Sequence, residues 1–195
     1  MKSIQVIALA LVFITAFSCK EAKKETEEAT EEIEETVDQV VETIDPEVIT
    51  FSMEPKSDSN VNGEVVFTQD NGEVIMRATF TGLDEGEHAI HLHEKADCSS
   101  ADGKSTGGHW NPTFEKHGKW GAEDGYHKGD IGNFTADADG NATVDFSTDE
   151  WCIGCDDEKK NILGKAVIVH QGVDDYTSQP SGAAGARIAC TGIIQ

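Results

Sequence analysis

The chain has 195 residues, of which 37 are acidic and 15 are lysine or arginine, so its formal net charge is −22. A chain with this net charge lacks the basic surface that binds the phosphates of nucleic acids, so we expect no nucleic-acid partner. The length leaves room for one domain with its own core, preceded by shorter segments of different composition.

The N-terminus predicts a secretory signal peptide over residues 1–18. Lys2 precedes an apolar run, Ile7 to Phe17, that is too short to span a bilayer. Cys19 follows "AFS" and resembles the lipidated cysteine of bacterial lipoproteins, although Ala16 stands where leucine is usual. We expect a lipid on Cys19; the alternative is a plain signal peptide without lipidation.

Residues 19–47 form an acidic tether in this interpretation. Residues 20–47 carry 12 acidic and 3 basic side chains, and such blocks repel themselves and stay extended or form solvated helix. An apolar stripe at helical spacing is too short to hold an isolated helix. We expect a flexible or partly helical spacer, with a short coiled coil as the alternative.

The sequence pattern of residues 48–195 is typical of an all-β domain. Short alternating runs recur, such as "EVVFTQ", "EVIMRATF", "NATVDFS" and "GKAVIVH". "DNG" at 70–72 between two of these runs predicts a hairpin. No long helical period is present, which favours a β-sandwich or barrel. Residues 94–129 and 171–185 have little strand character, and loops of that length usually carry function.

Histidines concentrate around those loops. In "HAIHLHE" a strand would place His91 and His93 on one face and His88 with the apolar residues on the other, so we expect His88 to be buried and bonded to backbone. His109, His117 and His127 lie in the long loop, with Asp130 three residues after the last, and His170 ends a strand. Three imidazoles and a carboxylate suit Zn²⁺, whereas imidazole-rich sets that are not tetrahedral suit copper.

These motifs resemble the bacterial copper/zinc superoxide dismutases over essentially all of residues 48–195. The matching stretches are "HLHE", "GGHWNPTFEKHG", "HKGDIGNFTADADG", "VIVH", "DDYTSQPSGAAGARIAC" and "TGII". The resemblance implies a flattened eight-stranded Greek-key β-barrel, an immunoglobulin-like sandwich, with long metal-binding and electrostatic loops. It also implies that the chain converts superoxide to dioxygen and hydrogen peroxide with Cu and Zn as cofactors.

The family's functional residues map onto this chain position by position. Copper would be bound by His91, His93, His109 and His170, and zinc by His109, His117, His127 and Asp130. His109 would bridge the two metals and act in catalysis, and Arg187 would attract and position the anionic substrate. Asp174 would link a copper histidine to a zinc histidine and fix both rings.

The resemblance also assigns two of the five cysteines. Cys98 and Cys190 would form the family disulfide, which in the chain-entropy model contributes on the order of 4 kcal/mol. Cys152 and Cys155 in "WCIGC" lie outside the family pattern. We expect a second, local disulfide there; the alternatives are a thiolate site that captures copper and a redox handle.

Export and the expected lipid place the protein in the periplasm or at the cell surface, with the outer membrane favoured because Lys20 follows Cys19. There it would protect the cell envelope from superoxide. The family forms dimers through different surfaces, so a homodimer is one assembly the resemblance allows. The alternative function is an exported copper/zinc carrier on the same barrel. The formal net charge of residues 48–195 is about −14, which repels an anionic substrate at long range. Attraction of the substrate must therefore be local, from Arg187 and from lysines 116, 119 and 128.

Overall fold

The computed structural model describes residues 46–195, so the predicted signal peptide, the Cys19 lipid and all of the predicted tether except Pro46 and Glu47 lie outside the described residues. The described residues contain eight strands: β1 (Glu47–Pro55), β2 (Asn62–Asp70), β3 (Glu73–Thr81), β4 (Gly86–His93), β5 (Gly132–Ala136), β6 (Ala142–Thr148), β7 (Ala166–His170) and β8 (Arg187–Gly192). A single 3₁₀ turn, η1 (Lys104–Thr106), interrupts the long β4–β5 connection. Within this part of the chain, no helix is long and apolar enough to cross a membrane.

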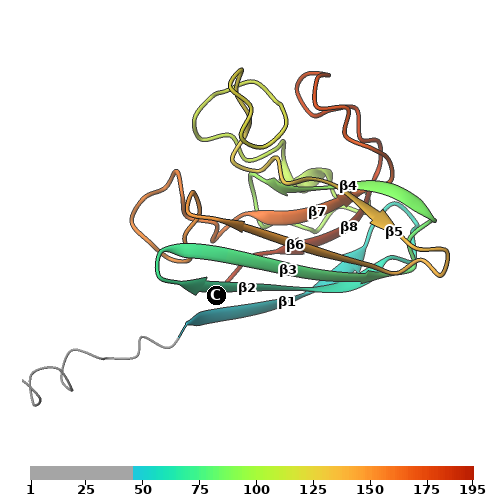
Figure 1. Cartoon of the computed structure of the whole chain (residues 1–195). Coiled ribbons are helices and arrows are strands. Elements are labelled where there is room, and N and C mark those ends of the chain that lie inside the picture. The colour runs from blue at the N-terminus through green and yellow to red at the C-terminus, as the bar shows by residue number, and fades with distance from the viewer. Residues whose placement is uncertain (1–45) are drawn as a thin grey trace, which may run out of the picture. The chain divides into compact units, whose positions relative to one another are not determined.

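The strands form one antiparallel sheet in the order β5-β4-β7-β8-β1-β2-β3-β6, which curls into a nearly closed barrel (Figure 1). The chain passes from β3 to β4 and from β6 to β7 across the barrel, and these crossovers make the Greek-key arrangement that the resemblance implied. The predicted hairpin at "DNG" joins β2 to β3. Asn71 and Gly72 both have positive φ there, as the tight turn of a hairpin requires.

The core follows from alternation along the strands. In β3, Val74, Met76, Ala78 and Phe80 are buried while the residues between them are exposed, so one face of the strand covers the core. β7 is buried at all five positions and β4 from His88 onward. Both faces of these strands are covered, one by the apolar core and the other by histidines and the loops above them.

Two long connections lie on the β4, β7 and β8 side of the barrel (Figure 1). Residues 94–131 join β4 to β5, and residues 171–186 join β7 to β8. They correspond to the two segments that lacked strand character in the sequence. Every predicted metal ligand is in these connections or at the ends of the strands beside them.

Candidate metal centre

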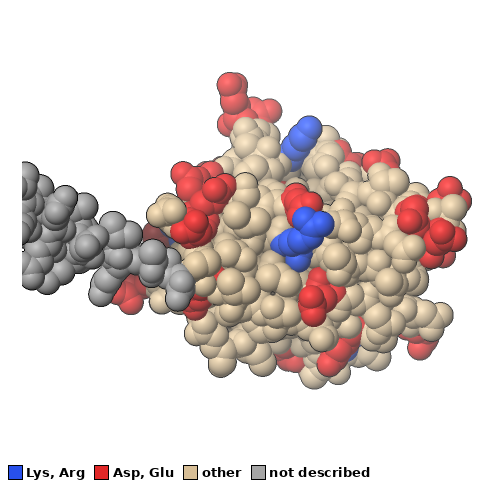
Figure 2. Space-filling model, turned by 60° about the horizontal axis from the view of Figure 1, so that its bottom comes forward, with Lys and Arg blue, Asp and Glu red and all other residues tan. Residues whose placement is uncertain are grey.

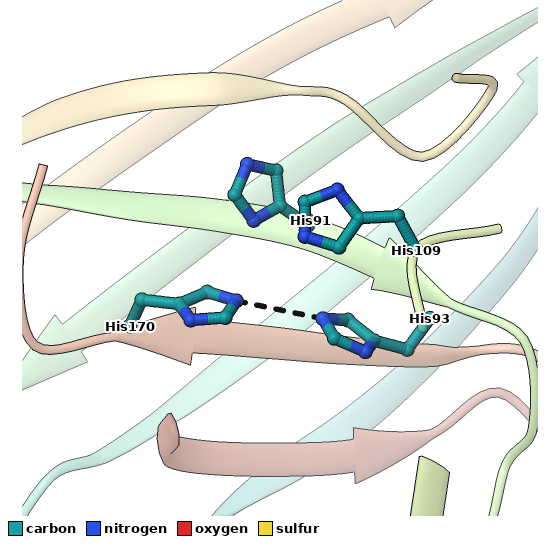
Figure 3. A group of neighbouring side chains, drawn as sticks. All are labelled: His91, His93, His109 and His170. Carbon is teal, nitrogen blue, oxygen red and sulfur yellow. Dashed lines mark hydrogen bonds between the residues drawn. The ribbon is translucent and has the colours of Figure 1, made fainter. Parts of the chain in front are cut away.

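Four histidines converge at the end of β4 and β7. His91 and His93 project from the same face of β4, and His170 is the last residue of the neighbouring strand β7 (Figure 3). One ring nitrogen from each of these and from His109 lies within 4.8 Å of the others. All four side chains are buried. The alternation predicted for "HLH" therefore delivers two imidazoles to one point.

The backbone places His109 beside β4. His109 pairs with His93 in an isolated antiparallel bridge, and the Trp110 amide donates to the Leu92 carbonyl at 2.8 Å. The His91 and His109 rings have centroids 4.0 Å apart. This short stretch of the loop behaves as one more strand, which is why a residue in a connection holds a fixed position in the site.

A second set of ligands shares His109. Nδ1 atoms of His109, His117 and His127 lie 2.8, 3.0 and 3.3 Å from the Asp130 carboxylate. The four residues are buried, and their nitrogen and oxygen atoms also lie within 4.8 Å of one another. His109 thus presents Nδ1 to this set and leaves Nε2 for the four-histidine set.

The unpaired ring nitrogens show that both sets fit a metal ion. The buried atoms His91 Nδ1 and His109 Nε2 have no hydrogen-bond partner among the described residues. His117 Nδ1 and His127 Nδ1 face the Asp130 carboxylate, which belongs to the same set. His93 Nε2 and His170 Nε2 face each other at 3.4 Å (Figure 3). Buried polar atoms are normally paired, so nitrogens that converge without partners indicate cation ligands. Four imidazoles suit copper, and three imidazoles with one carboxylate suit zinc.

Asp174 connects the two sets. Its carboxylate accepts from His91 Nε2 at 2.9 Å and from His117 Nε2 at 2.8 Å, so both rings turn Nδ1 toward the ligand positions. This is the arrangement that the resemblance implied for Asp174. Gly182, with φ of 65°, crosses directly above it, and a Cβ at that position would overlap the Asp174 carboxylate. Only glycine allows the loop to close over the link.

Burial and neighbouring charges shift the pKa values of the site in opposite directions. Burial lowers the pKa of His109 to about 4, although its bond to Asp130 acts the other way. Burial also holds the pKa of His93 and His170 well below the usual value, with further lowering from neighbouring histidines and Arg187. Burial would lower the pKa of His117 too, but bonds to Asp130 and Asp174 raise it to about 9.

The same bonds keep the two carboxylates ionised. Burial alone would raise the pKa of Asp130 and Asp174, but hydrogen bonds from the surrounding histidines hold both well below their usual range. The site therefore offers the neutral imidazoles of His93, His109 and His170 beside the ionised carboxylate of Asp130. That combination is suited to holding two cations of different chemistry side by side.

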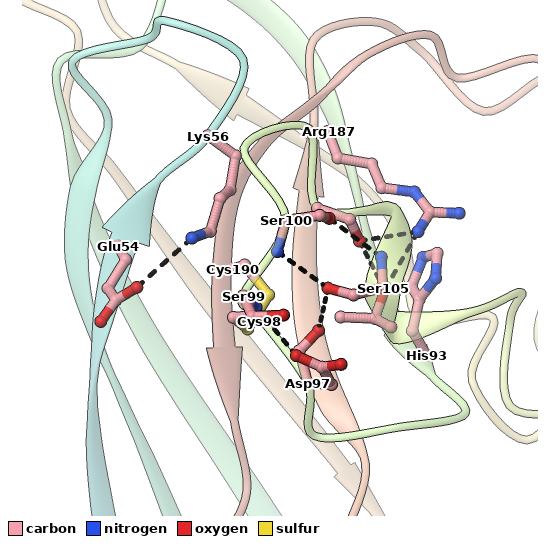
Figure 4. Close-up of a disulfide and its surroundings, with 12 residues drawn as sticks. Glu54, Lys56, His93, Asp97, Cys98, Ser99, Ser100, Ser105, Arg187 and Cys190 are labelled. Atoms are coloured by element: carbon pink, nitrogen blue, oxygen red, sulfur yellow. Dashed lines mark hydrogen bonds and ion pairs between the residues drawn. A yellow bond between two sulfur atoms is a disulfide. The ribbon is translucent and has the colours of Figure 1, made fainter.

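Arg187 is the positively charged side chain beside the four-histidine set. It lines a cavity of about 900 Å³ together with His93, His109 and His170. Its Nη1 donates to the Gly103 carbonyl at 2.9 Å and to Thr106 Oγ1 at 3.0 Å, and Figure 4 shows the guanidinium beside the His93 ring. Because the backbone around η1 fixes it there, Arg187 presents a positive charge to any small anion that enters.

The structure revises the expected sources of positive charge. The Lys128 amine is paired with Glu150, and neither Lys116 nor Lys119 lines the cavity. Lys104, which the sequence analysis did not single out, does line it, with its amine 3.0 Å from Asp102. The sequence offered only one signal for Lys104, its place in the long loop.

His88 lies outside both ligand sets, as expected. It is buried, with Nδ1 3.0 Å from the His170 carbonyl and Nε2 2.9 Å from the Asp84 carbonyl. It therefore fixes the backbone that carries His170 and does not face the metal sites.

Residues 46–195 contain two disulfides. Cys98–Cys190 joins the long loop to β8 close to Arg187 (Figure 4), across 92 residues of sequence. Cys152–Cys155 closes a turn of three residues in the β6–β7 connection. The backbone of that connection is also held by Asn161, whose side chain bonds to Gly154, Cys155 and Leu163. This independent support favours the local disulfide over a role in metal capture.

Comparison with known proteins gives a consistent result. The family model described as "Copper/zinc superoxide dismutase (SODC)" matches residues 61–194. A protein of Aquifex aeolicus named "Superoxide dismutase [Cu-Zn] 2" is 36% identical over 158 residues, covering 75% of this chain and 90% of that protein. "Superoxide dismutase [Cu-Zn]" of Caulobacter vibrioides is 35% identical over 142 residues, covering 71% of this chain and 80% of that one.

Solved structures share the fold. The structure of a double mutant of a SOD-like protein from Bacillus subtilis is 30% identical to this chain, with a TM-score of 0.67. The alignment covers 75% of this chain and 97% of that one.

Proposed function

The chain belongs to the copper/zinc superoxide dismutase family, and we propose that it performs this activity in the cell envelope, tethered to a membrane through Cys19. It is a superoxide dismutase with copper and zinc as cofactors, and it catalyses 2 O₂⁻ + 2 H⁺ → O₂ + H₂O₂. The ligand assignments, the catalytic residues and the location are the parts that we propose.

The observation that carries the assignment is the shared imidazole of His109. Its Nε2 belongs to the four-histidine set and its Nδ1 to the set that contains Asp130, and both sets lie beside the cavity that Arg187 lines. His91, His93, His109 and His170 would hold copper, and His109, His117, His127 and Asp130 would hold zinc. When bound, copper supplies the one-electron redox couple of the reaction, and zinc keeps the His109 ring oriented.

The side chains around the cavity do the remaining work. Arg187, fixed by Gly103 and Thr106, attracts the superoxide anion and holds it beside His93 and His170. His109 would hold a proton at Nε2 when that nitrogen is not bound to copper and would give it to the product, because Nε2 has no other partner among the described residues. Asp130 and Asp174 keep the rings of both sets turned to their ligand positions.

Envelope protection and lipid anchoring are supported by the N-terminal sequence. An apolar run of signal-peptide length precedes Cys19, and an acidic spacer separates that cysteine from β1. A lipid on Cys19 would keep the barrel at a membrane surface. The superoxide intercepted there would be that arising at or outside the membrane.

Metal analysis combined with a superoxide-consumption assay tests this function. We expect one copper and one zinc per chain and rapid consumption that requires copper. A carrier on the same barrel would bind both metals and consume superoxide no faster than the metal-free chain. That result would replace the enzyme with the carrier.

A further inference from the structure

The segment that follows β6 contacts both neighbours of His127. The Glu150 carboxylate accepts from the Tyr126 hydroxyl at 2.7 Å and forms an ion pair with the Lys128 amine. The Trp151 indole N–H donates to the Lys128 carbonyl at 2.8 Å. Residues on either side of His127 are therefore bound by two consecutive residues from another part of the chain.

The segment that makes these contacts is part of the rigid barrel. Trp151 is only 1% exposed and packs against Phe67 of β2 and Phe146 of β6. The backbone of the next residue, Cys152, is bonded on both sides, to Lys160 and Ile162. Trp151 is thus fixed against β2 and β6, and Glu150, the residue before it, donates its backbone amide to Thr148 Oγ1 at the end of β6 at 3.0 Å.

The loop that receives these contacts has little structure of its own. It spans residues 94–131 and contains only η1 as a regular element. Past His127, Gly129 is held by bonds to Leu92 and Trp110 of the β4 region. Before His127, the Glu150 carboxylate fixes Tyr126, and the Trp120 ring packs against Tyr126 and Trp151. Directly after His127, Glu150 and Trp151 both fix Lys128.

We infer that Glu150 and Trp151 are positioning residues for the zinc half of the centre. By holding Tyr126 and Lys128 they keep His127 and Asp130 in place before the ion binds. Metal ligands that must be ordered on binding lower the affinity, because the ordering cost is subtracted from the binding free energy. The inference rests on the zinc assignment proposed above, and it concerns residues that touch neither metal nor substrate.

Three conservative variants test the contacts separately. Trp151→Phe removes the indole N–H and keeps a buried ring, Glu150→Gln removes the charge, and Tyr126→Phe removes a single hydroxyl. Trp120→Phe is the matched aromatic control, since it alters the same cluster and its indole makes no hydrogen bond to residues 46–195. Asp145→Asn is the matched charge control, in an exposed pair with Arg77.

The measurement is the zinc dissociation constant of copper-free protein, determined by competition with a chelator. Loss of partners just outside a metal's ligands typically weakens metal binding by about tenfold or more. We therefore expect the zinc dissociation constant to rise about tenfold in Trp151→Phe and Glu150→Gln, and by less in Tyr126→Phe. The zinc dissociation constants of the two control variants should stay within about twofold of the wild-type value. Melting of the metal-free Tyr126→Phe protein should match that of wild type, which separates positioning from general stability.

The possible outcomes test the zinc assignment and the positioning role separately. Wild-type zinc affinity that survives His127→Ala would overturn the zinc assignment, and the positioning role with it. Tight zinc binding that requires His127 but is unchanged in all three variants would overturn the positioning role alone. An equal loss in Trp120→Phe and Trp151→Phe would also overturn it, because it would assign the effect to the aromatic cluster and not to the hydrogen bond.

Discussion

At the scale of single residues, the site depends on which ring nitrogen each histidine presents. Asp174 occupies Nε2 of His91 and His117, and Asp130 lies against Nδ1 of His109. Asp174 selects the ligand atom of its two rings, since a ring bonded at one nitrogen presents the other, whereas Asp130 is itself a member of the ligand set that contains His109 Nδ1. The geometry of the site therefore depends on the hydrogen-bond partners of the histidines as much as on the histidines themselves.

Asp174→Asn tests that choice. An amide in place of the carboxylate can accept from only one of the two rings through its oxygen, so one ring loses its fixed orientation. We expect weaker binding of both metals, by about tenfold or more, with a folded barrel. Chelator competition for each metal measures it, and unchanged affinity for both would contradict a linking role.

Arg187→Ala tests the attraction of the substrate. Arg187 lines the cavity but belongs to neither ligand set, so metal content should be unchanged. We expect kcat/KM to fall by about tenfold or more, because a local positive charge raises the arrival rate of an anion. The salt dependence of wild-type activity should weaken in the variant. Equal turnover by the two proteins would remove Arg187 from the mechanism.

The sequence identified residues near the site unevenly. The ligands stood out because histidine is rare and the motifs resemble a known family. Lys104 and Glu150 carried no such signal, and the quoted motifs that contain Gly182 and Trp151 gave no reason for either residue. The importance of all four comes from contacts with other segments of the chain. Lys128 was expected to aid steering, yet its amine is paired with Glu150. Such pairings are invisible until the loops are placed on the barrel.

At the scale of elements, strands were predictable and their order was not. Alternation in "EVIMRATF" corresponds to β3, and "DNG" to the β2–β3 turn. The neighbours of β1, however, are β2 and β8, which lies at the other end of the domain. Pairings between strands so far apart leave no local pattern, and the Greek-key order came from the family resemblance.

The two disulfides should differ in their effect on stability. Cys98–Cys190 closes 92 residues, so its removal should cost on the order of 4 kcal/mol and lower the melting temperature by about 10 °C. Replacing Cys152 and Cys155 by serine should cost under about 2 kcal/mol, because the closed turn is short and Asn161 also holds it.

Calorimetry of the two double variants measures the difference, and copper loading is the control. The Cys152/Cys155 variant should load copper as wild type does, even at limiting copper. Poor loading that is restored by excess copper would contradict the structural role and indicate copper capture. Titration of native protein should find no free thiol among Cys98, Cys152, Cys155 and Cys190.

At the scale of the whole molecule, an acidic protein acts on an anion. Figure 2 shows one face on which acidic side chains are widely spread and basic ones are few. Long-range repulsion from this charge must be offset close to the cavity by Arg187 and the bound metals, since the Lys104 amine is paired with Asp102. The acidic residues Glu94, Asp102 and Glu115 also line the cavity and reduce the local positive field.

Cys19→Ser tests the proposed attachment. Because the barrel begins at β1, a chain that is exported without the lipid should be soluble, fold normally and keep full activity. Fractionation of cells and a dismutase assay on the soluble fraction measure both expectations. A soluble, exported variant without activity would show that the N-terminal segment does more than tether the domain.

The central claim is that one imidazole, that of His109, joins a copper site to a zinc site in a superoxide dismutase. Its most direct test is superoxide consumption by purified protein that has been titrated with both metals, compared with His109→Ala. We predict one copper and one zinc per chain with rapid turnover in the wild type, and altered binding of both metals with a loss of at least about 100-fold in turnover in the variant. Wild-type turnover and unchanged binding of both metals in His109→Ala would contradict the account.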